Sequence, residues 1–139
     1  VPPFLVSAVL NLVIAQRLVG KICVQCIESY KPDSNLLELV KKQMKELGLE
    51  DAYKPLKILY RGKGCGSCGH SGLKGRIGIF EMFPVDEEIG KYIAAPDFSL
   101  SELRKSVRQK GMLTMFEDGF RKAERGMTTI EEVLRVIRE

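Results

Sequence analysis

Two Cys-x-x-Cys pairs constrain the fold of this chain more than any other sequence feature. The pairs are Cys23–Cys26 and Cys65–Cys68, and they contain all four cysteines of the 139-residue sequence. A Cys-x-x-Cys turn can direct both of its sulfur atoms at one ion, so two such turns supply the four thiolates of a tetrahedral zinc site. Because no coordination position remains for water, such an ion stabilises the fold and does no chemistry. We therefore predict a structural zinc site at Cys23, Cys26, Cys65 and Cys68.

The separation of the two pairs leaves alternatives open. There are 38 residues between Cys26 and Cys65, whereas the usual ribbon spacing is about 15 to 20, so a further element is expected between the pairs. The alternatives are two disulfides, a thioredoxin-like dithiol, a site in which His70 replaces one thiolate, and iron in place of zinc. Disulfides are disfavoured because nothing in the sequence indicates secretion, and a redox motif needs no duplicate.

Other motifs exclude several classes of enzyme. Gly64, Gly66 and Gly69 match the dinucleotide fingerprint, but the glycine-rich residues that follow cannot be the helix that receives a pyrophosphate. The sequence has no G-x-x-x-x-G-K-[S/T] phosphate loop, no G-x-S-x-G elbow and one histidine without a catalytic arrangement around it. We predict that this polypeptide alone catalyses nothing.

A zinc-ribbon module that binds nucleic acid is the alternative function. The net charge of +4 is mild and spread along the chain, but Lys63, Lys74 and Arg76 lie near the second cysteine pair and could meet phosphates. Against this reading, the ribbon loops offer no aromatic platform beyond Tyr60 and Phe80. We therefore expect no nucleic-acid partner.

The N-terminal residues form an apolar run from Val1 to Ala15. Gln16 and Arg17 end the run before it reaches the length of a membrane span, and no basic region precedes it as in a signal peptide. The sequence predicts a helix from about Pro3 to Gly20 that is apolar all round, and such a helix belongs inside a larger domain. We expect no membrane insertion, and we expect the chain to be a piece of a longer protein.

The rest of the chain predicts an α+β fold that is mostly helical. A helix is expected between Ser34 and Gly48, and strands at 57–61 and 76–83 flank the second cysteine pair, so they are expected to form a small zinc-binding β unit. After Pro84 the pattern predicts a C-terminal bundle of four short amphipathic helices. Their predicted cap residues are Asp86, Ser99, Thr114 and Thr129, the last three each followed three residues later by a glutamate, as in a capping box.

Several motifs, in order along essentially the whole chain, resemble the C-terminal part of the type II secretion and type IV pilus assembly ATPases. The motifs are Pro3-Phe4-Leu5, Ala15-Gln16-Arg17-Leu18, Cys23-x-x-Cys26, Gly64-Cys65-x-x-Cys68, Gly75-Arg76-x-Gly78-Ile79-Phe80-Glu81, Gly111-Met112, Glu117-Asp118-Gly119 and Gly126-x-Thr128-Thr129-x-Glu131-Glu132-Val133.

This resemblance implies a part of a bacterial motor. Members of the family are hexameric RecA-like ATPases that use ATP and Mg²⁺ to drive pilin or pseudopilin assembly through an inner-membrane platform protein, on the cytoplasmic side of that membrane. Residues 1–22 would then be the tail of the RecA-like α/β ATPase domain, 23–83 the tetracysteine zinc module, and 84–139 the C-terminal helical domain. The P-loop and Walker B motif would precede this segment. The expected partners are the ATPase core, neighbouring subunits of the homo-hexamer and the platform protein.

Two arginines match family positions that lie near the nucleotide-binding domain. They are Arg17 and Arg76, and the planar guanidinium of arginine suits contact with phosphate or adenine. An ion pair that fixes the end of a helix or strand is the simpler interpretation of both. We retain Arg17 and Arg76 as candidate nucleotide-adjacent residues.

Overall fold

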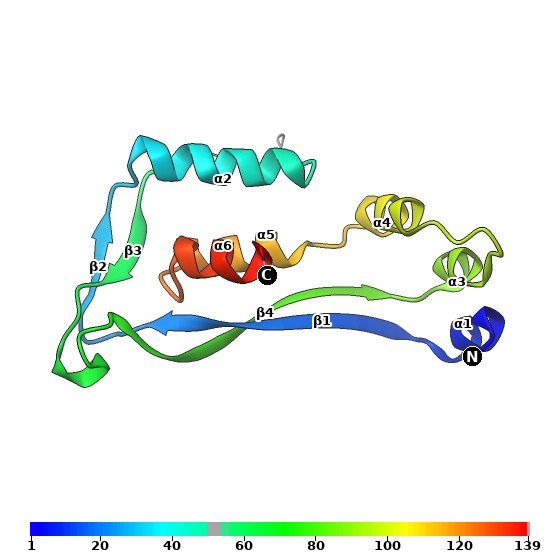
Figure 1. Ribbon diagram of the computed structural model, residues 1–139, viewed down its shortest axis with the longest axis horizontal. Coiled ribbons are helices and arrows are strands. Elements are labelled where there is room, and N and C mark those ends of the chain that lie inside the picture. The colour runs from blue at the N-terminus through cyan, green and yellow to red at the C-terminus, as the bar shows by residue number, and fades with distance from the viewer. Residues whose placement is uncertain (50–53, 55, 139) are drawn as a thin grey trace. The chain divides into compact units, whose positions relative to one another are not determined.

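The computed structural model describes residues 1–49, 54 and 56–138. The chain divides into two compact units. The first unit comprises Val1–Leu18 and Gly78–Gly119, and the second comprises Val19–Ile77 and Phe120–Glu139. Both helices and strands are present (Figure 1), so the predicted α+β class is confirmed.

The helices and strands have the following bounds. The α-helices are α1 (Pro3–Val9), α2 (Ser34–Glu46), α3 (Glu87–Ala94), α4 (Leu100–Gln109), α5 (Met115–Glu124) and α6 (Ile130–Arg138), and a short 3₁₀ helix, η2, spans Gly66–Cys68. The strands are β1 (Leu12–Ile22), β2 (Ile27–Tyr30), β3 (Leu59–Gly62) and β4 (Leu73–Pro84). β1 pairs with β4, and β2 pairs with β3 in antiparallel register, with Tyr30 opposite Leu59.

The predicted N-terminal helix is correct at its start and wrong beyond Val9. α1 begins at Pro3, where a proline suits the first turn. From Leu12 the chain is strand β1 instead of a continuing helix to Gly20. An apolar run does not distinguish a helix from a strand by periodicity alone, and β-branched side chains such as Val13 and Ile14 favour the extended form. Pairing with β4 supplies the backbone partners that the sequence could not reveal.

The two predicted strands exist, but they do not pair with each other. The strand expected at 57–61 is β3, and its partner is β2. The strand expected at 76–83 is β4, and its partner is β1. Each predicted strand thus pairs with one that the sequence analysis missed. β2 has only four residues, too few for a clear alternating pattern.

The predicted helix starts after Pro84 are confirmed, and their caps are visible as hydrogen bonds. The Asp86 carboxylate accepts the Ile89 N–H at 2.9 Å at the start of α3. At α5 the capping box is complete, since the Thr114 hydroxyl accepts the Glu117 N–H at 3.2 Å and the Glu117 carboxylate accepts the Thr114 N–H at 2.7 Å. These helices are divided between the two units, because the chain passes from one unit to the other within α5.

The first unit has a small apolar core. Ile89, Leu103 and Val107 are buried, and the partly buried residues packed against them are Phe83, Val85, Tyr92, Ile93 and Met112. Two side chains attach the start of α5 to β4 in this unit. The Asp118 carboxylate accepts the Phe80 N–H at 2.9 Å, and the Glu81 carboxylate accepts the Met115 N–H at 3.1 Å. α1 contacts α3 and leaves several of its apolar side chains exposed.

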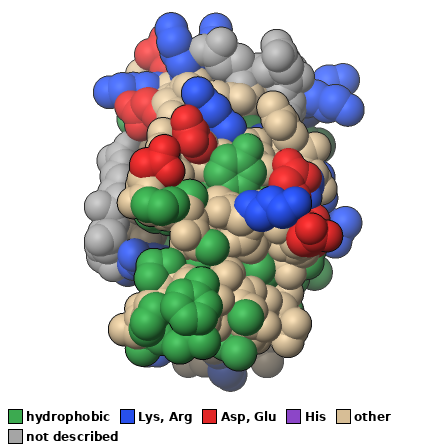
Figure 2. All heavy atoms as spheres, turned by 90° about the vertical axis from the view of Figure 1, so that its right-hand side faces the viewer, with side chains coloured by type: hydrophobic (Ala, Val, Ile, Leu, Met, Phe, Trp, Pro, Cys, Tyr) green, Lys and Arg blue, Asp and Glu red, His purple; other side chains and the backbone are tan. Residues whose placement is uncertain are grey.

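The exposed apolar residues of α1 and of its N-terminal flank are Val1, Phe4, Leu5 and Val9. Figure 2 shows apolar side chains gathered at the lower end of the face that carries this helix. In the described part of the chain, no helix has both the length and the apolar content needed to cross a membrane.

The second unit buries one face of α6 and parts of the strands that lead to the cysteines. On α6 the buried side chains are Ile130, Val133, Leu134 and Val136. Val19 and Ile22 are buried at the end of β1, directly before the first cysteine. The unit therefore contains both the C-terminal helix and the four cysteines.

Candidate metal centre

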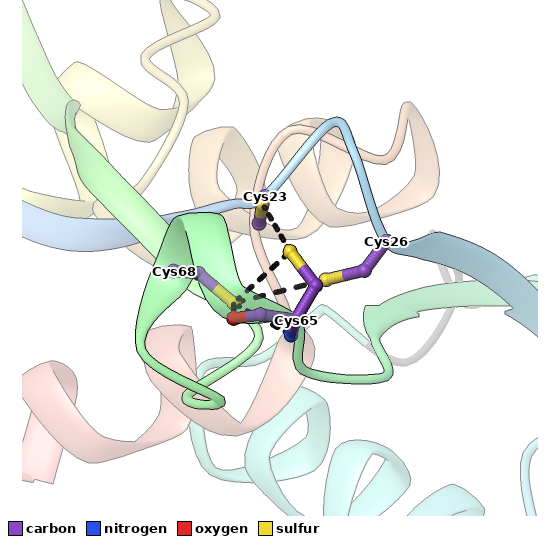
Figure 3. A group of neighbouring side chains, drawn as sticks. All are labelled: Cys23, Cys26, Cys65 and Cys68. Carbon is purple, nitrogen blue, oxygen red and sulfur yellow. Dashed lines mark hydrogen bonds between the residues drawn. The ribbon is translucent and has the colours of Figure 1, made fainter.

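The four cysteine side chains converge, as the sequence predicts (Figure 3). All four sulfur atoms lie within 4.8 Å of one another. The Sγ–Sγ distances are 3.9 Å for Cys23–Cys65, 3.9 Å for Cys26–Cys68 and 3.8 Å for Cys65–Cys68. Zn–S bonds of about 2.3 Å at tetrahedral angles place neighbouring sulfurs about 3.8 Å apart. The geometry of the thiols therefore fits one tetrahedrally coordinated ion.

Two similar turns present the cysteines. The first connects β1 to β2, and its Cys26 N–H donates to the Cys23 carbonyl at 3.2 Å. The second contains η2, and its Cys68 N–H donates to the Cys65 carbonyl, also at 3.2 Å. Each turn brings the first and fourth residues of Cys-x-x-Cys onto the same side, so both sulfurs face one point. The repeated spacing in the sequence thus becomes a repeated local structure.

Backbone hydrogen bonds join the two turns to each other. The Cys23 N–H donates to the Gly72 carbonyl at 2.9 Å, and the Lys63 N–H donates to the Cys26 carbonyl at 2.9 Å. The first cysteine turn is therefore hydrogen-bonded to the chain on both sides of the second one. This pairing is the physical reason that cysteines 42 residues apart meet.

Glycines permit the close approach of backbone in the second turn. A Cβ atom at Gly64, where φ is +90°, would lie 2.6 Å from the backbone oxygen of His70. A Cβ atom at Gly62 would lie 2.1 Å from the backbone oxygen of Gly72. Side chains at these positions would force apart the two sides of the loop that contains Cys65 and Cys68. The glycines thus serve the fold of this loop, which leads into strand β4 and not into the α-helix that a dinucleotide fingerprint requires.

Backbone N–H groups stabilise one thiolate in advance of metal binding. The Cys68 sulfur accepts the N–H groups of Cys65 at 3.2 Å and Gly72 at 3.3 Å. These bonds, chiefly that from Cys65, lower the pKa of the Cys68 thiol to about 6. Desolvation raises the pKa of the Cys26 thiol to about 12. A metal ion that binds here must displace protons, so its affinity rises with pH.

Two of the alternatives, disulfide bonds and a metal ligand from His70, are less well supported by this geometry. The closest sulfurs are 3.8 Å apart, whereas a disulfide bond measures about 2.05 Å, and all four cysteines are free. His70 is exposed and does not belong to the cluster of ligand atoms found among the described residues. The residues able to hold a metal are therefore Cys23, Cys26, Cys65 and Cys68.

Lys63 and Lys74, two of the basic residues near the second turn, have partners in the protein. Lys63 forms an ion pair with Glu28 at 3.2 Å, and Arg61 pairs with the same carboxylate at 2.9 Å. These two cations lower the pKa of Glu28, mainly through the hydrogen bond from Arg61. Lys74 donates a hydrogen bond to Ser67 at 2.6 Å. Part of the positive charge invoked for nucleic-acid binding is thus neutralised within the chain.

The two candidate nucleotide-adjacent arginines are exposed. Arg17 lies on β1 and Arg76 on β4. Neither belongs to the sulfur cluster.

The structure also brings Thr128 and Glu132 to the strand that precedes Cys23, which the sequence analysis did not predict. The sequence pattern predicts Glu132 only as part of a capping box. The Thr129 hydroxyl does accept the Glu132 N–H at 3.2 Å, but the Glu132 carboxylate accepts the N–H of Gly20. A pattern of spacing along one helix carries no signal for a contact more than 100 residues away.

The fold and the site define a class of protein: an α+β segment in which four cysteine thiols lie close enough together to hold one metal ion. Residues 1–135 match the family model described as "Type II/IV secretion system protein". This chain therefore belongs to that family, in agreement with the predicted resemblance.

Relatives with curated names agree with this assignment. The chain is 44% identical over 134 residues to the type IV pilus assembly ATPase PilB of Thermus thermophilus, covering 96% of this chain and 14% of that protein. It is 38% identical over 139 residues to the type II secretion system protein E of Pseudomonas aeruginosa, covering 100% of this chain and 26% of that protein. The corresponding ATPase E of Vibrio cholerae is 37% identical over 139 residues, with 25% of that protein covered. The chain thus spans about a seventh to a quarter of the length of these relatives.

Proposed function

We propose that this chain is the C-terminal, non-catalytic segment of a hexameric ATPase motor that powers type IV pilus assembly or type II protein secretion. In this proposal Cys23, Cys26, Cys65 and Cys68 hold a structural zinc ion. The whole protein hydrolyses ATP with Mg²⁺ at the cytoplasmic face of the bacterial inner membrane. The observation that carries the metal role is the set of Sγ–Sγ distances of 3.8 to 3.9 Å.

The proposal assigns three parts to the chain. Residues 1–22 are the tail of the RecA-like ATPase domain, 23–83 the zinc module, and 84–139 a helical domain that contacts neighbouring subunits and the platform protein. The exposed apolar residues of α1, which include Phe4 and Val9, support the first assignment. An apolar surface of this kind is favourable when it packs against another part of the same domain.

In this proposal the zinc ion also stabilises the folded second unit. An ion bound by the four thiolates links two turns that belong to distant parts of the sequence, so its binding free energy adds to the stability of the second unit.

Arg17 and Arg76 are exposed on their strands, so both guanidinium groups can reach an atom outside this chain. We propose that they lie near the nucleotide in the assembled motor.

Metal content tests the proposal directly. The 139-residue chain purified without added metal should contain about one zinc ion per molecule, measured by inductively coupled plasma mass spectrometry. Cys65→Ser should lose most of this zinc, and Ser67→Ala, in the same turn but without a ligand atom, should retain it. A well-folded wild-type chain with no bound metal would contradict the structural role.

Measurements of ATP hydrolysis and of nucleic-acid binding complete the test. The 139-residue chain should show no ATP turnover. Measurable hydrolysis would mean that catalytic residues lie within this chain, contrary to the proposal. It should also show no binding to single-stranded DNA or RNA at low salt. Salt-dependent binding would favour the nucleic-acid module instead.

A further inference from the structure

We propose that Thr128 and Glu132 are positioning residues for the metal centre, because they fix the strand that delivers Cys23 to it. This inference rests on the proposed metal-binding role of the four cysteines. It concerns a contact between the start of the C-terminal helix and a strand more than 100 residues earlier in the sequence. Both partners lie in the second unit.

The Glu132 and Thr128 side chains form hydrogen bonds with the two backbone groups of Gly20. The Gly20 N–H donates to the Glu132 carboxylate at 2.6 Å. The Thr128 hydroxyl donates to the Gly20 carbonyl at 2.7 Å. The Thr128 side chain is fully buried, so its hydroxyl has no access to water as an alternative partner. Loss of the hydroxyl would leave the Gly20 carbonyl without this hydrogen bond.

A third hydrogen bond continues the attachment toward the cysteine. The Ile22 N–H donates to the Met127 carbonyl at 3.0 Å, and Cys23 is the next residue. The segment 127–132 therefore contacts alternate residues of the strand, Gly20 and Ile22, immediately before the first metal ligand. Since Val19 and Ile22 are also buried, the strand has little freedom to shift against this segment.

Residue 20 must be small for this contact to form. A Cβ atom at Gly20 would lie 2.8 Å from the Leu73 side chain and 3.0 Å from the Glu132 carboxylate. A side chain at this position would require the Leu73 side chain and the Glu132 carboxylate to shift. The glycine and the glutamate are thus complementary across the contact.

Arg135 orients the Glu132 carboxylate. Its guanidinium makes two hydrogen bonds to the two carboxylate oxygens, at 3.1 and 3.0 Å. These bonds, followed by the bond from the Gly20 N–H, lower the pKa of Glu132. The carboxylate is therefore ionised at neutral pH, and a charged acceptor makes the stronger bond to a backbone N–H.

The consequence concerns the metal. Binding four thiolates at one tetrahedral point requires each sulfur to be held near its final position before the ion arrives, and groups outside the ligand set usually supply this order. Cys65 and Cys68 are ordered by bonds within their own turn. Cys23 is held by the turn bond from Cys26 and by the bond from its own N–H to Gly72, and the strand that precedes it fixes its position further. Release of Gly20 should therefore weaken metal binding even though no ligand is removed.

The experiment measures zinc affinity of the 139-residue chain by competition with a chromophoric chelator. Relative to wild type, Glu132→Ala and Thr128→Val should each weaken binding about tenfold, the lower end of the usual effect for groups that orient metal ligands. Thr128→Ser keeps the hydroxyl and should restore affinity to within about twofold of wild type, by the same reasoning. Cobalt(II) spectra of the same variants should show weaker or broadened visible bands, because the four thiolates surround the ion less regularly.

Glu117→Ala is the matched control. Glu117 has the same place in the capping box of α5 that Glu132 has in α6, but it lies in the first unit. Its loss should destabilise its helix and leave zinc affinity and the cobalt spectrum unchanged.

The outcomes separate this inference from the proposed function. If the wild-type chain binds neither zinc nor cobalt, the proposed metal centre fails. If it binds both, and folded Glu132→Ala and Thr128→Val match its affinity and spectrum, the positioning role alone is overturned. If Glu132→Ala does not fold, Thr128→Val and its comparison with Thr128→Ser decide the question.

Discussion

Removal of Glu117 should destabilise the first unit by about 2 kcal/mol, the sum of a helix-cap and an ion-pair contribution. Its carboxylate accepts the Thr114 N–H at 2.7 Å and the Thr114 hydroxyl at 3.0 Å, which caps α5. The same carboxylate accepts a hydrogen bond from the Arg108 guanidinium at 2.6 Å, from the last turn of α4. One side chain therefore caps one helix and attaches it to another.

The magnitude follows from the exposure of the two partners. Loss of a capping side chain costs about 1 kcal/mol. A hydrogen bond between charged groups contributes about 1.5 to 3 kcal/mol when it is shielded. The side chains of Arg108 and Glu117 retain 31% and 13% of their accessible surface, so solvent screens the pair in part. We reduce the second contribution to about 1 kcal/mol accordingly.

A double-mutant cycle separates the two contributions. Urea unfolding, followed by far-UV circular dichroism, is measured for the wild type, Arg108→Ala, Glu117→Ala and the double variant. The coupling energy between the two sites should be about 1 kcal/mol, and Glu117→Ala alone should cost more than Arg108→Ala. Lys105→Ala is a control on the exposed face of α4 and should change stability by less than about 0.5 kcal/mol.

A coupling energy below about 0.3 kcal/mol would refute this reasoning, because values of that size are found for independent sites. It would mean that the short contact between Arg108 and Glu117 does not add to stability. The cap would then be the sole contribution of Glu117.

Three further predictions concern the two units. Gly64→Ala should weaken zinc binding at least fivefold in chelator competition, because a left-handed φ of +90° and a Cβ contact at 2.6 Å both oppose the substitution. Gly66→Ala places its Cβ atom in open space and should leave zinc binding unchanged. Ile89→Ala should lower the free energy of unfolding by about 2 to 4 kcal/mol in urea titrations and leave zinc affinity unchanged, since this fully buried residue belongs to the first unit. Acid should destabilise the second unit as the pH falls below about 4.5, because the pKa of Glu132 is lower in the folded state than its ordinary value of 4.5, and the stabilisation from the ionised carboxylate is lost as the pH falls through the folded pKa. Arg135→Ala should reduce the dependence of the unfolding free energy on pH across that range, and equal slopes for the variant and the wild type would contradict this prediction.

Local chemistry allowed much of the site to be predicted. Cys-x-x-Cys turns are determined by a few backbone hydrogen bonds within each turn, such as that from Cys68 to Cys65, and sequence spacing encodes them directly. The helix caps at Asp86 and Thr114 are local in the same way, since each side chain bonds a backbone group three residues away. Interactions of this range are recorded in short sequence patterns.

Pairing between distant segments could not be predicted in this manner. Leu12–Ile22 is a strand because β4 lies beside it, and its apolar composition is equally compatible with a buried helix. The contact of Glu132 with Gly20 depends on the same long-range arrangement. The strand and the contact were both missed for one reason. A short sequence pattern reflects only the interactions of a residue with its near neighbours in the chain, and not those with remote segments.

The position of α6 changes the interpretation of the metal centre. The amphipathic spacing groups this helix with the other short helices after Pro84, but α6 belongs to the compact unit that contains the cysteines. Its buried face and the segment before it attach to the strand that ends at Cys23. In the positioning role that we propose, the order of the metal site depends on residues from both ends of the unit's sequence, Gly20 near its start and Glu132 near its end. A metal ion that ties Cys23 to Cys65 also restrains the strand that Glu132 contacts, and by reciprocity the helix that fixes the strand favours the ion. The two proposals together therefore predict that metal binding and the packing of α6 are coupled through Gly20.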